Sequence, residues 1–153
     1  CPAGEVIEPY PSSWSTTRDD VAAHNPYPLW RAPGNRLHDL QWEYISHCEE
    51  LLAVAGRYAD SDEAKKFASM AGDRFQPALH SCQFWWASGR PMWDVTMVHR
   101  GLLLLTEVAL YASRAIRQGS ASGRVKKEAL WRLTAANEAR RELEALLFLD
   151  GTP

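Results

Sequence analysis

The feature that most constrains the fold is a run of apolar residues between positions 95 and 116 that recur at alternating spacings of three and four. This spacing places them on one face of an α-helix and is typical of the seam of a left-handed helical bundle. The seam consists of Val95, Val98, Leu102, Leu105, Ala109, Ala112 and Ile116. Other segments also show helical spacing, and none shows the alternation of a half-buried strand. The sequence therefore predicts an all-α protein, an up-down bundle of about four long helices.

Capping residues and helix breakers set the expected boundaries of the remaining helices. Besides the seam helix, helices are expected over 35–58, 61–88 and 124–149. Asn35 is a suitable N-cap for the first of them. Pro77 removes a backbone donor and should kink or split the second. Pro91 is suited to the first turn of the seam helix, which is therefore expected to begin there.

The first 34 residues predict an irregular segment. Six prolines fall in it, and prolines at this density exclude a helix and limit sheet pairing. The segment also contains Trp14 and Trp30, whereas disordered linkers are poor in aromatic residues. We therefore expect an ordered N-terminal strap over 1–34 that lies on a helical bundle over 35–150, with these two Trp side chains as its anchors.

Composition limits the number of domains and the kinds of partner. A chain of 153 residues suits one domain, and a net charge of −2 gives no electrostatic basis for binding nucleic acid or an anionic membrane. Cys1, Cys48 and Cys82 are odd in number and irregularly spaced, which argues against a disulfide framework and suits a cytoplasmic location. Because Cys1 stands where an initiator Met would be, we expect a fragment of a longer chain rather than a lipoprotein cleaved before its Cys.

The sequence contains no motif of nucleophilic, phosphate-binding or zinc-protease chemistry. His80 and Cys82 would point about 200° apart on a helix and so could not chelate one ion together. We therefore predict no metal ion, no cofactor and no catalytic residue in this chain. Arg74 and His80 form an Arg-x5-His pair similar to that of some small helical ribonucleases, although a surface Arg and a buried His is the simpler interpretation.

Large aromatic and polar side chains concentrate in the run from His80 to Trp93 and in segments expected to lie near it. Aromatic faces stack on sugar rings, and ligand sites combine apolar walls with a few polar groups. The candidate substrate-binding residues are Trp14, Trp30, His38, Trp42, His80, Gln83, Trp86, Arg90 and Trp93. We expect His80 and Gln83 to face the strap or a separate domain, and Trp86 to face the core. The alternative is that these Trp rings pack against the chain's own helices.

Three segments together resemble the C-terminal helical region of glycoside hydrolase family 57-like proteins, which belong to the glycoside hydrolase/deacetylase barrel group. The segments are Pro11–Thr17, Pro28–Glu43 and His80–Trp93. The resemblance implies a seven-stranded β/α barrel that precedes the bundle and carries the catalytic Glu and Asp. The run that begins at Gln83 departs from the Ser-Ser-Asp-Trp-like element of branching-enzyme members, which leaves the substrate open.

The resemblance implies a function for this chain as an accessory domain that supplies an aromatic-polar wall of a substrate cleft and catalyses nothing alone. Its partner would be the barrel of the same protein or a partner chain, and its ligand an oligosaccharide. The alternative function is a structural or interaction bundle that docks a partner domain through its Trp-rich surface, because Trp and Arg are enriched at interface hot spots.

Overall fold

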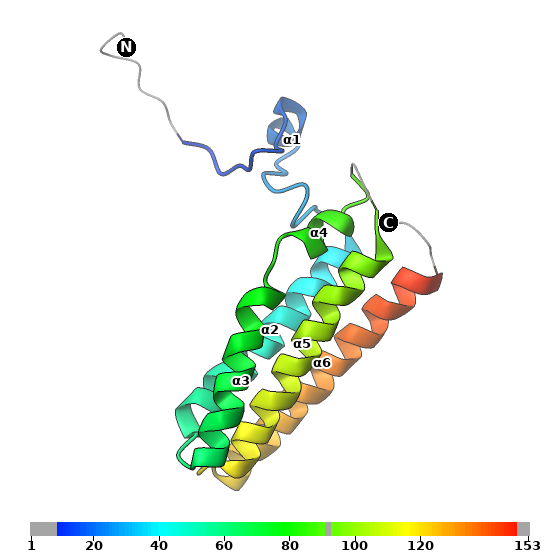
Figure 1. The fold of residues 1–153 in the computed structure, drawn as a ribbon. Helices are drawn as coiled ribbons and strands as arrows, with labels where there is room; N and C mark the ends of the chain where they lie inside the picture. The colour runs from blue at the N-terminus through cyan, green and yellow to red at the C-terminus, as the bar shows by residue number, and fades with distance from the viewer. Residues whose placement is uncertain (1–8, 91–92, 150–153) are drawn as a thin grey trace, which may run out of the picture.

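The computed structural model describes residues 9–90 and 93–149, which contain six helices and no strand (Figure 1). The predicted all-α bundle is confirmed. The helices are α1 (Arg18–Ala22), α2 (Arg36–Tyr58), α3 (Asp62–Ala78), α4 (Cys82–Trp86), α5 (Val95–Gln118) and α6 (Gly123–Leu149). Cys1 and Pro91, on which two of the expectations above rest, lie outside the described residues.

The predicted starts of α2 and α3 are confirmed by their N-caps. The Asn35 side chain accepts a hydrogen bond from the His38 backbone N–H, and Ser61 does the same for Ala64. The helix expected over 61–88 is split near Pro77, since α3 ends at Ala78 and α4 is a separate helix of five residues.

The seam helix begins later than predicted. Its N-cap is Asp94, whose carboxylate accepts hydrogen bonds from the backbone N–H groups of Thr96 (2.8 Å) and Met97 (3.2 Å). Asp is among the best N-cap residues, and its negative charge is favourable at the positive end of the helix dipole. This cap, and not the expected start at Pro91, fixes the first turn of α5.

The core of the bundle is built around α2 and α5. Helix α5 packs most extensively against α3 and α2, and α2 packs against α6. Of the predicted seam, the side chains from Val98 to Ile116 are all buried, and Val95 is half-buried. Among the described helices, α5 alone is long and apolar enough to cross a membrane by length and composition, a test that core helices of soluble proteins also pass.

The N-terminal strap differs from the prediction in two ways. It contains a short helix, α1, because Thr17 and Asp20 form a capping box. Figure 1 shows this part of the strap beyond the end of the bundle near α4, rather than along the helices. Trp14 is 78% exposed and is therefore not a buried anchor, whereas Leu29 is buried and Trp30 packs against the core.

Candidate functional site at the aromatic end of the bundle

Helix α4 is held in place by side chains of α2 and its N-cap. The last carbonyl groups of a helix have no partner within it, and a helix of five residues can satisfy few of them itself. Three side chains supply the missing donors. The bonds are Asn35 Nδ2 to Ala87 O (3.0 Å), His38 Nε2 to Phe84 O (2.9 Å) and Gln41 Nε2 to Gln83 O (3.0 Å). These three side chains thus position α4 by binding its backbone.

The His38 ring is uncharged, and each of its two nitrogens takes part in a hydrogen bond. Its Nδ1 accepts a hydrogen bond from the Ala32 backbone N–H at 3.1 Å, so that Nε2 carries the proton donated to Phe84 O. The ring has no exposed surface, and this burial lowers the pKa of His38. Protonation of Nδ1 would place its N–H against the Ala32 N–H, so that two donors would face each other. His38 therefore joins the strap to α4 and is inaccessible to a ligand at the surface.

Gln83 faces α5, and the expectation that it faces the strap or a separate domain is wrong. Its side chain is fully buried, and its Nε2 donates to the Ala78 backbone carbonyl. The same side chain lies against Gly101 of α5, where the absence of a Cβ leaves room for it. The physical reason is that α4 packs against α5, where Gly101 leaves the room that the Gln83 side chain fills.

Four Trp side chains form a cluster beyond this buried layer, which we call the aromatic end: Trp14, Trp30, Trp42 and Trp85. The Trp14 ring packs edge-on, with its centroid 6.5 Å from that of Trp30 and 6.2 Å from that of Trp85. Trp42 donates from Nε1 to the Trp30 carbonyl at 2.8 Å. Its ring stacks on Phe84 with centroids 4.8 Å apart. The strap, α2 and α4 thus contribute rings to one surface.

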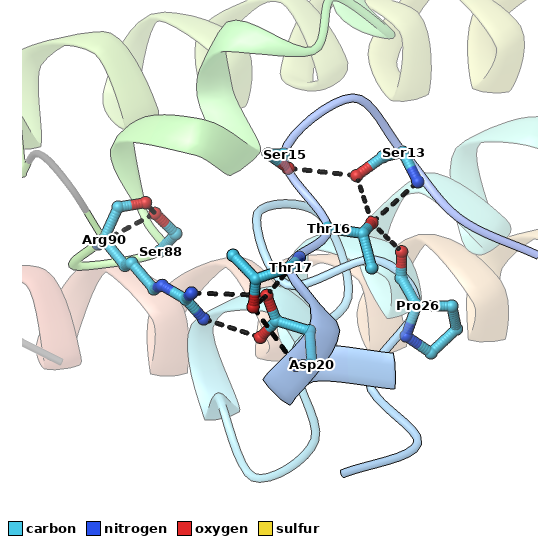
Figure 2. A network of polar contacts seen from close by, with 8 residues as sticks. All are labelled: Ser13, Ser15, Thr16, Thr17, Asp20, Pro26, Ser88 and Arg90. Atoms are coloured by element: carbon cyan, nitrogen blue, oxygen red, sulfur yellow. Dashed lines mark hydrogen bonds and ion pairs between the residues drawn. The ribbon is translucent and has the colours of Figure 1, made fainter. Parts of the chain in front are cut away.

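An ion pair ties the strap to the segment that follows α4, as Figure 2 shows. The Arg90 guanidinium binds both carboxylate oxygens of Asp20, at 2.7 and 3.2 Å. Arg90 and then Thr17 hold the pKa of the Asp20 carboxyl well below its usual range. Arg90 is half-exposed while Asp20 is buried, so the pair closes the strap and leaves one face of the guanidinium accessible.

Hydroxyl groups brace both sides of this ion pair (Figure 2). In the strap, Thr16 Oγ1 donates to the Pro26 carbonyl at 2.7 Å and also pairs with Ser13. After α4, Ser88 Oγ donates to the Trp85 carbonyl and accepts from the Arg90 backbone N–H. The loop that presents Arg90 is therefore anchored on the helix that carries Trp85.

The structure places the nine predicted residues in several different environments. Trp14, Trp30, Trp42 and Arg90 meet at or beside the aromatic end. His38 and Gln83 lie buried beneath it, and Trp86 and Trp93 pack against the hydrophobic core, which confirms the core-facing prediction for Trp86. His80 is half-buried, and burial together with the nearby Arg100 lowers its pKa. Ligand contact stays a prediction for the other seven, whereas His38 and Gln83 have no exposed surface for a ligand to contact.

Sequence reasoning missed four residues that shape this region. Trp85 and Phe84 lie within the run from His80 to Trp93. The short helix α4 directs Trp85 toward Trp14 and Phe84 toward Trp42, which the sequence alone does not indicate. Gln41 had no signal of its own, because a polar residue on a helix does not reveal that its amide will bind the Gln83 carbonyl of α4. Asp20 had one local signal, the Thr17-x-x-Asp20 spacing of a capping box.

Neither a cluster of metal ligands nor the pair of Arg74 and His80 is assembled in the described part of the chain. No three His, Cys, Asp or Glu side chains there lie close enough to hold a metal ion. Arg74, the candidate partner of His80 in a ribonuclease-like pair, instead binds Glu107 of α5 at 2.7 Å.

A scan of protein-family models and searches of curated proteins and of solved structures each returned no match to this chain. Its function is accordingly argued from the geometry above, and the resemblance to family 57-like proteins stays a prediction.

Proposed function

We propose that this chain is a non-catalytic accessory helical domain that presents an aromatic surface to a carbohydrate, in the manner implied for family 57-like enzymes. The observation that carries the proposal is Trp14, which is 78% exposed and yet fixed in position by the rings of Trp30 and Trp85. A Trp side chain so placed combines a large accessible apolar area with a defined orientation.

Polar groups beside the aromatic end support a sugar rather than a purely apolar ligand. The half-exposed Arg90 guanidinium keeps donors available beyond those bound to Asp20, and the partly buried hydroxyl of Ser15 lies next to Trp14 in the strap. Ligand sites combine apolar walls with a small number of polar groups of this kind. In this proposal His38 and Gln83 hold α4, and therefore Trp85, in place. They do not bind the sugar themselves.

Catalysis belongs to another domain in this proposal. The barrel of the same protein, or a partner chain, would supply the catalytic acids, and the aromatic end would form one wall of its cleft. We place the protein in the cytoplasm, where thiols stay reduced, because Cys48 and Cys82 are both free.

A second candidate function, docking of a partner domain, is favoured by the extent of the exposed aromatic surface. Besides Trp14, the same strap exposes Tyr10 (47%) and Tyr27 (40%). Aromatic residues that cluster in this way are typical of interface hot spots. The two functions share the same surface and differ in what covers it.

A fluorescence titration with malto-oligosaccharides separates the two functions. The carbohydrate proposal predicts a saturable change in Trp emission that Trp14→Ala abolishes. Trp131→Ala is the matched control, because Trp131 of α6 is 64% exposed and contacts His47 of α2 rather than the aromatic end. This variant should bind as the original chain does.

A flat response to every glycan tested contradicts the carbohydrate proposal and leaves docking. Docking in turn predicts that Trp14 becomes protected from acrylamide quenching when the proposed barrel or partner chain is bound. Equal quenching of Trp14 with and without that partner, together with the flat glycan response, contradicts both functions.

A further inference from the structure

A groove lies between α5 and α6 in the half of the bundle that is farthest from the aromatic end. Its volume is about 420 Å³, within the range of small-molecule sites. The buried side chains of Ile116 and Ala129 form its floor, and Leu110 and Leu130 flank it. The groove is thus apolar along most of its length.

The walls of the groove are unusually exposed for apolar side chains. Leu110 of α5 is 52% exposed and Leu130 of α6 is 62% exposed. Helix α5 directs its main packing toward α3 and α2, which leaves this side of the α5–α6 pair open. A ligand seated between the two leucines would remove both from water, a change that favours binding.

The end of the groove next to the α5–α6 turn is positively charged. Arg114, Arg117 and Lys126 line it, and no acidic residue does. Within residues 9–90 and 93–149, none of these three cations forms an ion pair with a carboxylate. Arg114 lies over the Phe67 ring, 5.4 Å from its centroid, so Arg117 and Lys126 are the cations free to meet a ligand.

One polar contact fixes this charged end. Lys126 Nζ donates to the Arg117 carbonyl at 3.1 Å, which holds the ammonium group at the mouth of the groove. The Ser113 hydroxyl in the groove wall has no hydrogen-bond partner in the described part of the chain, whereas a helical Ser commonly binds the carbonyl four residues before it. The apolar part of the groove therefore lies next to three polar groups, the Ser113 hydroxyl, Arg117 and Lys126.

We propose that this groove binds a single-chain amphiphile with an anionic headgroup, a long-chain fatty acid carboxylate. The carboxylate would lie between Arg117 and Lys126, where charge-assisted hydrogen bonds are strongest. The hydrocarbon chain would extend between Leu110 and Leu130 over Ala129. Charge complementarity favours this occupant. A neutral amphiphile would leave Arg117 and Lys126 without an opposite charge, and a cationic one would be repelled by them.

The test is calorimetric titration of the full chain with dodecanoate, dodecyl phosphate and dodecyltrimethylammonium, each kept below its micellar concentration. Dodecanoate should bind at least about tenfold more tightly than the cationic amphiphile. Tighter binding of dodecyl phosphate than of dodecanoate would assign the site to phosphate headgroups and overturn the carboxylate assignment.

Charge-reversal variants locate the site. Lys126→Glu combined with Arg117→Glu should weaken dodecanoate binding by at least about tenfold, since each reversal replaces an attraction by a repulsion. Lys127→Glu is the matched control: it makes the same change one residue away, at an exposed position outside the groove, and should alter the affinity less than about threefold. Thermal unfolding of each variant confirms that the bundle is intact.

Three results overturn the proposal. One is equal binding of the anionic and cationic amphiphiles, which would mean a merely apolar surface. Another is an unchanged affinity in the double charge-reversal variant. The third is a dimer in sedimentation that dodecanoate does not dissociate and that Leu130→Glu does, which would mean that a second copy covers the groove. Because the groove and the aromatic end lie at opposite ends of the bundle, these results are independent of the glycan titration.

Discussion

Gln83 of α4 occupies the space that a side chain at Gly101 of α5 would need. A Cβ at position 101 would come within 2.7 Å of Gln83 Cδ, closer than such atoms approach in proteins. Gln83 has no exposed surface, and its amide is bound to the Ala78 carbonyl, so it has no free direction in which to move. The contact fixes the distance between α4 and α5.

Gly101→Ala should therefore destabilise the protein, although alanine favours helices. The gain in helix propensity is about 1 kcal/mol, and overpacking a close contact costs about 1–3 kcal/mol. Gly72→Ala in α3 is the matched control, because nothing lies within 4 Å of a Cβ there, and it should raise stability. Urea unfolding of both variants checks the prediction, and a stabilised Gly101→Ala would contradict it.

The buried His38 should make stability rise with pH. Because burial lowers its folded pKa, the unfolded chain binds a proton at higher pH than the folded one does, near pH 6.5. The stabilisation is thus fully present above about pH 6.5 and is lost as pH falls through the folded pKa. His47 and His80, whose pKa values burial also lowers, add to this slope. Urea midpoints between pH 5 and 7.5 measure it.

His38→Leu should cost about 1–3 kcal/mol at neutral pH, since it leaves the Ala32 N–H without a partner and the Phe84 carbonyl with the Ala87 N–H alone. It should also reduce the pH slope. His80→Gln serves for comparison, because it leaves both of these hydrogen bonds in place. A larger loss of stability in His80→Gln than in His38→Leu would show that His38 does not hold the strap and α4 together.

The ion pair between Asp20 and Arg90 should make attachment of the strap acid-sensitive. The folded pKa of Asp20 lies below its unfolded value of about 3.9, so the stabilisation is present above about pH 4 and is lost as pH falls through the folded pKa. Trp fluorescence between pH 6 and pH 2 should report loss of the contacts between Trp14 and its neighbours.

Asp20→Asn should loosen the strap at neutral pH and remove this part of the acid dependence. Glu128→Gln breaks an exposed pair with Arg124 and should leave the fluorescence profile unchanged. If Asp20→Asn and the original chain share the same acid profile, the ion pair does not hold the strap.

Cys48 should resist alkylation while the protein is folded. Its thiol is fully buried near the Leu105 carbonyl, and burial raises the pKa of Cys48 to about 12. The thiolate is the reactive form, so iodoacetamide should modify the half-buried Cys82 long before Cys48. Mass spectrometry of peptides checks the order. Equal rates without denaturant would indicate that the core around α2 opens readily.

The long helices could be predicted from the sequence because their signals are local. The spacing of residues 98–116 fixes a buried face, and Asn35 and Ser61 satisfy the free N–H groups of the turns that follow them. The start of α5 was misplaced because two local signals competed, a proline and the Asp94 cap. Helix α1 was not predicted because the prolines around it favour an irregular segment, although Thr17 and Asp20 have the spacing of a capping box.

The candidate site could be predicted only in part, because its geometry depends on contacts distant in sequence. The sequence grouped Trp14, Trp30 and Trp42 as candidates, and the structure places them next to one another. The burial of Gln83 depends on a glycine in another helix, and the closure of the strap depends on Asp20 and Arg90, which are 70 positions apart. No spacing along one helix contains that information.

The way in which α2 holds α4 has a consequence for how this surface can change. Asn35, His38 and Gln41 bind carbonyl oxygens, which every amino acid possesses. Substitutions at the outward positions of α4, such as Trp85, therefore leave those three bonds in place. Selection can alter what the aromatic end recognises while the helix that carries it keeps its position, so a new specificity at this end requires few compensating changes in the bundle.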